Sequence, residues 1–184
     1  ASTDRQSVDP LPGRPGLIVQ MTEQQAATAA APLVFSNWRH FLAFGFGSGL
    51  ARFAPGTFGT LVAVPVYLLL NQLSPWLYVA CVFATFNFGV WLCGSVTRDL
   101  GVHDHGGIVW DEFVGYWITM FFAPAGWVWV VTGFALFRLF DIWKPWPIRW
   151  IDRRVDGGLG IMLDDVLAGI VSCLVLHAIR IGTS

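Results

Sequence analysis

The sequence is poor in charged residues and has no surplus of positive charge. Asp, Glu, Lys and Arg make up 12% of its 184 residues, against roughly 25% in an average soluble domain. Eleven basic and twelve acidic residues give a formal net charge of −1, whereas nucleic-acid binding requires a basic surface. We therefore expect neither an ordinary soluble domain nor a nucleic-acid partner.

Cysteine is scarce, and the start of the chain lacks the features of a secretory leader. Cys81, Cys93 and Cys173 lie in apolar stretches, without the spacing of a metal site or of a disulfide framework. Residues 1–37 are rich in Ala, Gln, Thr and Pro, with neither a basic start nor an apolar centre. We expect residues 1–37 to form a flexible tail and residues 38–184 to form a single domain.

Hydrophobic residues, in contrast, are abundant and occur in long uncharged runs. They make up 55% of the sequence and include ten Trp and fifteen Phe. No Asp, Glu, Lys or Arg occurs within 53–97, 113–137 or 166–179. A transmembrane helix needs about 20 mainly apolar residues. We therefore predict an all-α integral membrane protein, a small bundle of about four to five transmembrane helices in the lipid bilayer.

The uncharged runs also predict where these helices lie. Three spans are expected near 57–73, 76–96 and 161–181. The run 113–137 is long enough for one tilted span, because its 25 residues rise about 37 Å as a helix. Alternatively, Pro124-Ala125-Gly126 divides this run into two helices, near 108–123 and 126–142.

The distribution of Lys and Arg favours the divided run. With two helices, ten of the eleven Lys and Arg lie on one side of the membrane, and only Arg180 lies on the other. Such an excess is typical of the cytoplasmic side. A single span would instead carry Arg138, Lys144 and three further Arg across the membrane. We expect the helical hairpin, with the N-terminal tail and both charged stretches in the cytoplasm.

The segment 41–60, FLAFGFGSGLARFAPGTFGT, is too rich in Gly to form an ordinary span. We expect it to be a re-entrant or interfacial segment. Gly residues let backbone amides approach an anion, and they also let membrane helices pack closely. The sequence favours neither explanation over the other.

The charges of the domain cluster in two stretches, 98–112 and 138–165, which hold four and five of the twelve acidic residues. The hairpin places both stretches at one membrane face. A simple explanation is that the acidic pairs cap or begin helices and that Arg138 pairs with Asp141. That explanation leaves Lys144 unexplained, and ionisable residues at membrane depth are costly and usually face the bundle interior.

Together these residues indicate metal-assisted phosphoryl chemistry at the cytoplasmic face. Carboxylates from three regions of the chain suit a hard divalent cation such as Mg²⁺, which prefers oxygen ligands. Lys144 suits a phosphate group as a point charge, and Arg138 suits it as a planar fork. The carboxylates are Asp111, Glu112, Asp141, Asp164 and Asp165.

Five sequence blocks resemble the bacterial phosphatidylglycerophosphatase A family. In order along the chain, they are GFGSGL, PGTFGTL, GVHDHGGIVWDEFVGYWITM, FRLFDIWKPWPIRWIDR and GGLGIMLDDVLAG. The resemblance extends from Trp38 to Ile181. It implies a Mg²⁺-dependent, multi-pass phosphatase of the bacterial inner membrane with its active site facing the cytoplasm. Its reaction would convert phosphatidylglycerophosphate to phosphatidylglycerol and inorganic phosphate, the last step of phosphatidylglycerol synthesis.

The resemblance also implies roles for individual residues. Metal ligation falls to Asp111, Glu112, Asp141, Asp164 and Asp165, and phosphate binding falls to Thr57, Arg138 and Lys144. The expected catalytic residues are Asp111, Glu112 and Asp165. We expect attack by a metal-activated water, with Asp165 or Glu112 as general base. A phospho-aspartyl intermediate is less favoured, because the D-x-D-x-[TV] pattern of the aspartyl phosphatases is absent.

Three other functions are less consistent with the sequence. A CDP-alcohol phosphotransferase would continue Asp156-Gly157 with a pattern that is missing, and an acid-phosphatase-like lipid phosphatase would need different Lys–Arg spacing and a Ser-Gly-His motif. A small channel or assembly factor would instead use the charges to line a cavity. The oligomeric state has no signature in the sequence.

Overall fold

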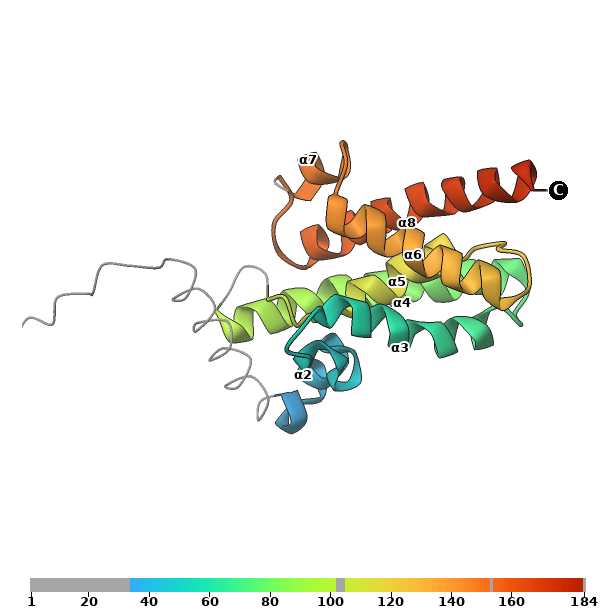
Figure 1. Ribbon diagram of the computed structural model, residues 1–184. Coiled ribbons are helices and arrows are strands. Elements are labelled where there is room, and N and C mark those ends of the chain that lie inside the picture. The colour runs from blue at the N-terminus through green and yellow to red at the C-terminus, as the bar shows by residue number, and fades with distance from the viewer. Residues whose placement is uncertain (1–33, 102–104, 153, 184) are drawn as a thin grey trace, which may run out of the picture.

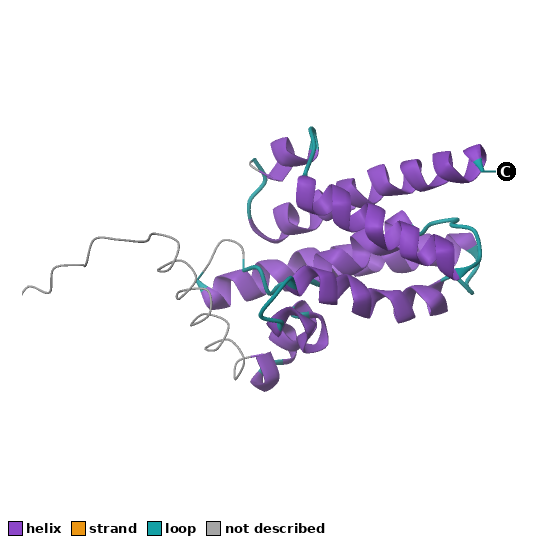
Figure 2. Cartoon of the chain, in the orientation of Figure 1, coloured by secondary structure: helices purple, strands orange, loops and turns teal. Residues whose placement is uncertain are grey.

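The computed structural model describes residues 34–101, 105–152 and 154–183. Within these ranges every regular element is a helix, which confirms the all-α prediction there (Figure 2). Residues 1–33 of the predicted tail lie outside the described residues, while Val34 is buried. The elements are α2 (Trp38–Ala43), the 3₁₀ helix η1 (Gly45–Leu50), α3 (Pro55–Leu70), α4 (Pro75–Leu100), α5 (Trp110–Thr119), α6 (Trp127–Trp143), α7 (Ile148–Asp152) and α8 (Gly157–Gly182).

Two of the described helices, α4 and α8, are long and apolar enough to cross a membrane. Each has 26 residues, which rise about 39 Å, against a hydrocarbon core about 30 Å thick. They include the spans predicted near 76–96 and 161–181. The apolar helix α3 is shorter, with 16 residues. Figure 1 shows the long helices side by side, with α7 at the end of the bundle where α8 begins.

The uncharged run 113–137 forms two helices, α5 and α6, so the predicted break is confirmed. Phe122 and Gly126 turn the chain with φ angles of 57° and 121°. The first helix is shorter than the predicted segment 108–123. It begins only at Trp110, because the preceding Val109 has a φ of −137° and donates its N–H to the Ala43 carbonyl instead of entering the helix.

Helix α5 lies at the centre of the bundle, where it contacts α3, α4, α6 and α8. Gly residues allow its close approach to α8. A Cβ atom on Gly169 would collide with the carbonyl oxygen of Gly115, and a Cβ atom on Gly115 would lie 2.7 Å from the carbonyl oxygen of Asp165. The crossing of these two backbones therefore fixes the beginning of α5 beside the first half of α8.

Close packing also explains part of the Gly-rich segment. A Cβ atom on Gly49, in η1, would collide with the carbonyl of Gly107. Gly45 has a φ of 54°, and a Cβ there would lie 2.6 Å from the Val109 side chain. These two Gly residues let η1 pack against the segment that leads into α5.

We predict that Gly169→Ala destabilises the protein. The added methyl group meets the Gly115 backbone, which cannot rotate away as a side chain can, so we expect a loss of about 1–3 kcal/mol. The matched control is Gly182→Ala on the same helix, where a Cβ atom meets open space. Thermal unfolding in detergent, followed by circular dichroism, should show a lower midpoint for Gly169→Ala alone. Equal midpoints for the two variants would contradict the crossing described above.

Candidate active site

The carboxylates selected from the sequence come together from three helices. Asp111 and Glu112 lie in the first turn of α5, and Asp141 lies near the end of α6. Asp164 and Asp165 are buried well inside α8, which has no acidic residue in its first turn, so their explanation as helix-capping acids is wrong. Asp165 interacts electrostatically with each of the other four carboxylates. These five residues form the acidic cluster.

Arg138 joins two members of the acidic cluster. Its Nη1 atom lies 3.0 Å from Glu112 Oε1 and 2.6 Å from Asp141 Oδ2. The other carboxylate oxygen of Glu112 accepts a hydrogen bond of 2.9 Å from the Thr60 hydroxyl. Both oxygens of this buried side chain are therefore occupied, and Glu112 is held between α3 and α6.

Lys144 joins a third member of the cluster to α7. It ends α6 in a left-handed conformation with a φ of 43°. Its Nζ atom donates to Asp164 Oδ2 at 2.5 Å and to Asp152 Oδ1 at 2.8 Å. Burial disfavours the ammonium charge, but the two carboxylates outweigh that effect and raise the pKa of Lys144 above its ordinary value. Lys144 therefore stays protonated at neutral pH.

Three oxygens of the cluster have no hydrogen-bond partner among the described residues. They are Asp111 Oδ1, Asp164 Oδ1 and Asp165 Oδ2, and all three are buried. A buried carboxylate oxygen without a partner is costly, because it has lost its hydration without replacement. A hard cation would supply the missing interaction, and an all-oxygen donor set is what Mg²⁺ prefers.

The acidic cluster fits a cation by its chemistry more than by its present side-chain arrangement. Within the described part of the chain, no group of three or more Asp, Glu, His or Cys side chains is already placed to hold a metal ion. Arg138 and Lys144 instead occupy oxygens of Glu112, Asp141 and Asp164. The cluster thus combines unpaired oxygens with oxygens that are held by cationic side chains.

The beginning of α3 reaches the same cluster through Gly56. A Cβ atom there would collide with Glu112 Oε1 and would lie 2.8 Å from Arg138 Nη2. A helix N-terminus carries a partial positive charge and suits anions. The next residue, Thr57, is half-buried in this first turn. Among the described residues its hydroxyl has no hydrogen-bond partner. The start of α3 therefore lies at the cluster, but the Thr57 side chain makes no hydrogen bond to it.

Sequence reasoning missed two residues that hold the cluster together. Thr60 donates to Glu112, and it lies three residues after Thr57 in the repeated Gly-Thr pattern of PGTFGT. That spacing puts both Thr residues on related faces of one helix and was a usable signal. Asp152, which pairs with Lys144, had no such signal, because the contact depends on how α7 folds back after α6.

A family model and two relatives carry the same family name. The family model for phosphatidylglycerophosphatase A matches residues 41–180. Phosphatidylglycerophosphatase A of Escherichia coli (strain K12) is 52% identical over 153 residues, which cover 82% of this chain and 88% of the relative. The protein of the same name from Haemophilus influenzae is 48% identical over 143 residues, which cover 77% and 88%. No solved structure matches the chain.

We predict that Thr60→Val lowers the free energy of unfolding, because it removes the only hydroxyl that Glu112 Oε2 contacts among the described residues. Leaving a buried acceptor without its donor costs about 1–3 kcal/mol. The control is Thr132→Val on α6, whose hydroxyl bonds an exposed helix carbonyl, and for which a change within about 0.5 kcal/mol is expected. Chemical denaturation of both variants in the same detergent measures the difference. A Thr60→Val variant as stable as Thr132→Val would show that this hydrogen bond does not hold Glu112.

Proposed function

The chain belongs to the phosphatidylglycerophosphatase A family and is a phosphatase, and from this we propose that the acidic cluster is its active site for phosphatidylglycerophosphate. The products would be phosphatidylglycerol and inorganic phosphate. One observation carries the proposal: carboxylates from α5, α6 and α8 converge, together with Arg138 and Lys144, inside the matched region. No other group of ionisable side chains in the described ranges combines unpaired carboxylate oxygens with two cations.

The proposed location is the bacterial inner membrane, with several spans and the cluster at the cytoplasmic face. Helices α4 and α8 are the candidate spans. The distribution of Lys and Arg supports this orientation, since it leaves only Arg180 on the far side. Helix α5 has ten residues and is largely buried among its neighbours, so its short length is compatible with a place inside the bundle. A lipid substrate would then keep its acyl chains in the bilayer while its phosphate group reaches the cluster.

Arg138 and Lys144 would bind the phosphate group. Both are cationic and both already contact carboxylate oxygens, which phosphate oxygens resemble in geometry and charge. An incoming phosphate would therefore compete with Asp141 and Asp164 for the same donors. The start of α3, with Thr57, would add partial positive charge on a third side.

Mg²⁺ is the proposed cofactor. The unpartnered oxygens of Asp111 and Asp164 make these two residues the first candidates to hold it, and Glu112 and Asp141 would complete the set. When bound, the ion supplies positive charge that polarises the phosphomonoester.

The general base would be a carboxylate of the cluster. Of the two residues expected for this role, Glu112 has both oxygens occupied by Thr60 and Arg138, whereas Asp165 keeps one oxygen without a partner. We therefore favour Asp165 as the acceptor of the proton from the attacking water. The water oxygen would bond to phosphorus as one of its protons passes to Asp165. The P–O bond to the glycerol oxygen would break, that oxygen would take a proton from solvent, and Asp165 would then release its own proton.

We expect Asp111→Asn, Glu112→Gln and Asp165→Asn each to lower turnover at least about a hundredfold, and excess EDTA to abolish it. The measurement is release of inorganic phosphate from phosphatidylglycerophosphate by detergent-purified protein with Mg²⁺. Asp99→Asn is the matched control, because Asp99 pairs with Arg39 and His40 instead of the cluster. It should retain activity within a few-fold of the wild type. Near-normal release by all three cluster variants would refute the site assignment.

A further inference from the structure

We propose that a groove between α4 and α8 binds one acyl chain of the lipid whose phosphate group is hydrolysed at the acidic cluster. This inference rests on the proposed function. It assigns a second part of the substrate to a definite surface of the protein.

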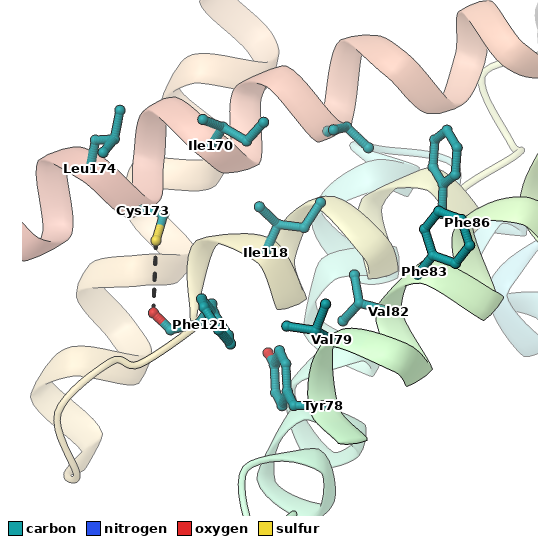
Figure 3. Close-up of a pocket in the computed structure, with 11 residues that line it drawn as sticks. Tyr78, Val79, Val82, Phe83, Phe86, Ile118, Phe121, Ile170, Cys173 and Leu174 are labelled. Carbon is teal, nitrogen blue, oxygen red and sulfur yellow. Dashed lines mark hydrogen bonds between the residues drawn. The ribbon is translucent and has the colours of Figure 1, made fainter. Parts of the chain in front are cut away.

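The groove is apolar and large enough for such a ligand. Its volume is about 460 Å³, within the range of roughly 300–1,000 Å³ that is typical of small-molecule sites. Phe83 and Phe86 of α4 form one wall, Ile170 and Leu174 of α8 form the other, and Ile118 of α5 forms the floor (Figure 3). Aliphatic and aromatic side chains on all sides suit a hydrocarbon chain.

The two polar side chains that line the groove already have hydrogen-bond partners. The Tyr78 hydroxyl donates to the Trp117 carbonyl at 2.6 Å. The Cys173 thiol lies 3.7 Å from the Phe121 carbonyl oxygen, as the dashed line in Figure 3 marks. Neither group therefore needs a hydrogen bond from a ligand. A sugar, a nucleotide or a peptide backbone would lose its hydration here without replacement.

The groove opens in the direction from which a lipid would come. Its two walls belong to α4 and α8, the candidate membrane spans of the described chain. At its rim, Phe83 is 67% exposed and Leu174 is 66% exposed. In a bilayer this opening faces hydrocarbon, so an acyl chain can enter sideways while its headgroup stays at the membrane surface.

The groove begins next to the acidic cluster along α8. Val166, which lines it, directly follows Asp165. Ile118 lies two helical turns after Asp111 on the same face of α5. From Val166 the groove follows α8 to Leu174, a rise of about 12 Å. A phosphate group at the cluster therefore places the attached glycerol and the start of an acyl chain at the Val166 end of the groove.

The opposite wall begins at the same level. Trp110, next to Asp111, directs its indole N–H to the Thr85 carbonyl of α4 at 3.4 Å. Phe86, the neighbour of Thr85, is the groove residue nearest that end of α4. The α4 wall thus begins beside the start of α5, and the α8 wall begins beside Asp165. A ligand with an anionic head and an apolar tail fits both environments.

Photo-crosslinking tests this placement directly. The probe is phosphatidylglycerophosphate with a diazirine halfway along one acyl chain, added to wild-type protein in phosphatidylcholine nanodiscs, with and without excess unlabelled substrate. We expect substrate-competed cross-links in peptides that contain residues 78–86 and 166–174. Competed cross-links confined to other surfaces would overturn the inference.

A pair of variants gives a kinetic test. Ile170→Trp fills the groove, whereas Ile179→Trp makes the same change on α8 outside the groove, at similar exposure (43% and 39%). We expect Ile170→Trp to lower kcat/KM for a long-chain substrate about tenfold, with much less effect on a dihexanoyl substrate whose chains are too short to fill the groove. Retained activity on the short-chain substrate would show that the variant is folded. Equal kcat/KM values for both Trp variants on both substrates would overturn the inference.

The same samples separate the two proposals. If wild-type protein releases phosphate but neither cross-links nor kinetics involve the groove, the acyl-chain assignment is wrong and the proposed function stands. If wild-type protein releases no phosphate from either substrate, the proposed function is wrong, and the inference that rests on it fails with it.

Discussion

The close approach of α5 and α8 determines where the four acids on these helices lie. At their crossing, Gly169 meets the backbone of Gly115, and no Cβ atom fits between them. Each helix carries a pair of adjacent acids, Asp111 with Glu112 and Asp164 with Asp165, in the half nearer to the charged loops. A bulkier residue at the crossing would separate the helices and disperse the acids. The position of the acids in the site thus depends on the packing of two small residues.

Bringing these acids together creates electrostatic repulsion, which the cationic side chains of the protein offset only in part. Arg138 and Lys144 neutralise some of the charge through their ion pairs with Glu112, Asp141 and Asp164. Three buried oxygens stay without a partner among the described residues. Isolated charge at low dielectric is unfavourable enough that a counterion is the simplest remedy. The same deficit would make the cluster receptive to a divalent cation and, through its two cationic side chains, to a phosphate group.

Charge patterning in the sequence was sufficient to predict the long helices, the break after α5 and the residues of the cluster, because uncharged runs and clustered acids are local features. It was not sufficient for the beginning of α5, which depends on a hydrogen bond from Val109 to Ala43 about 66 residues away in the chain. Neither could it predict that α8 begins as early as Gly157, which places Asp164 and Asp165 beyond its first turn, or that Asp152 pairs with Lys144. The groove between α4 and α8 was equally inaccessible, because it arises from the packing of three helices.

In the proposed active site, the acidic cluster holds a divalent cation where hydrolysis takes place. Anomalous diffraction at the manganese edge, from crystals of the full chain grown with Mn²⁺ in place of Mg²⁺, measures this most directly. We expect a peak within about 2.0–2.6 Å of carboxylate oxygens of both Asp111 and Asp164. A well-ordered cluster without a peak, at a Mn²⁺ concentration that supports phosphate release, would contradict this expectation.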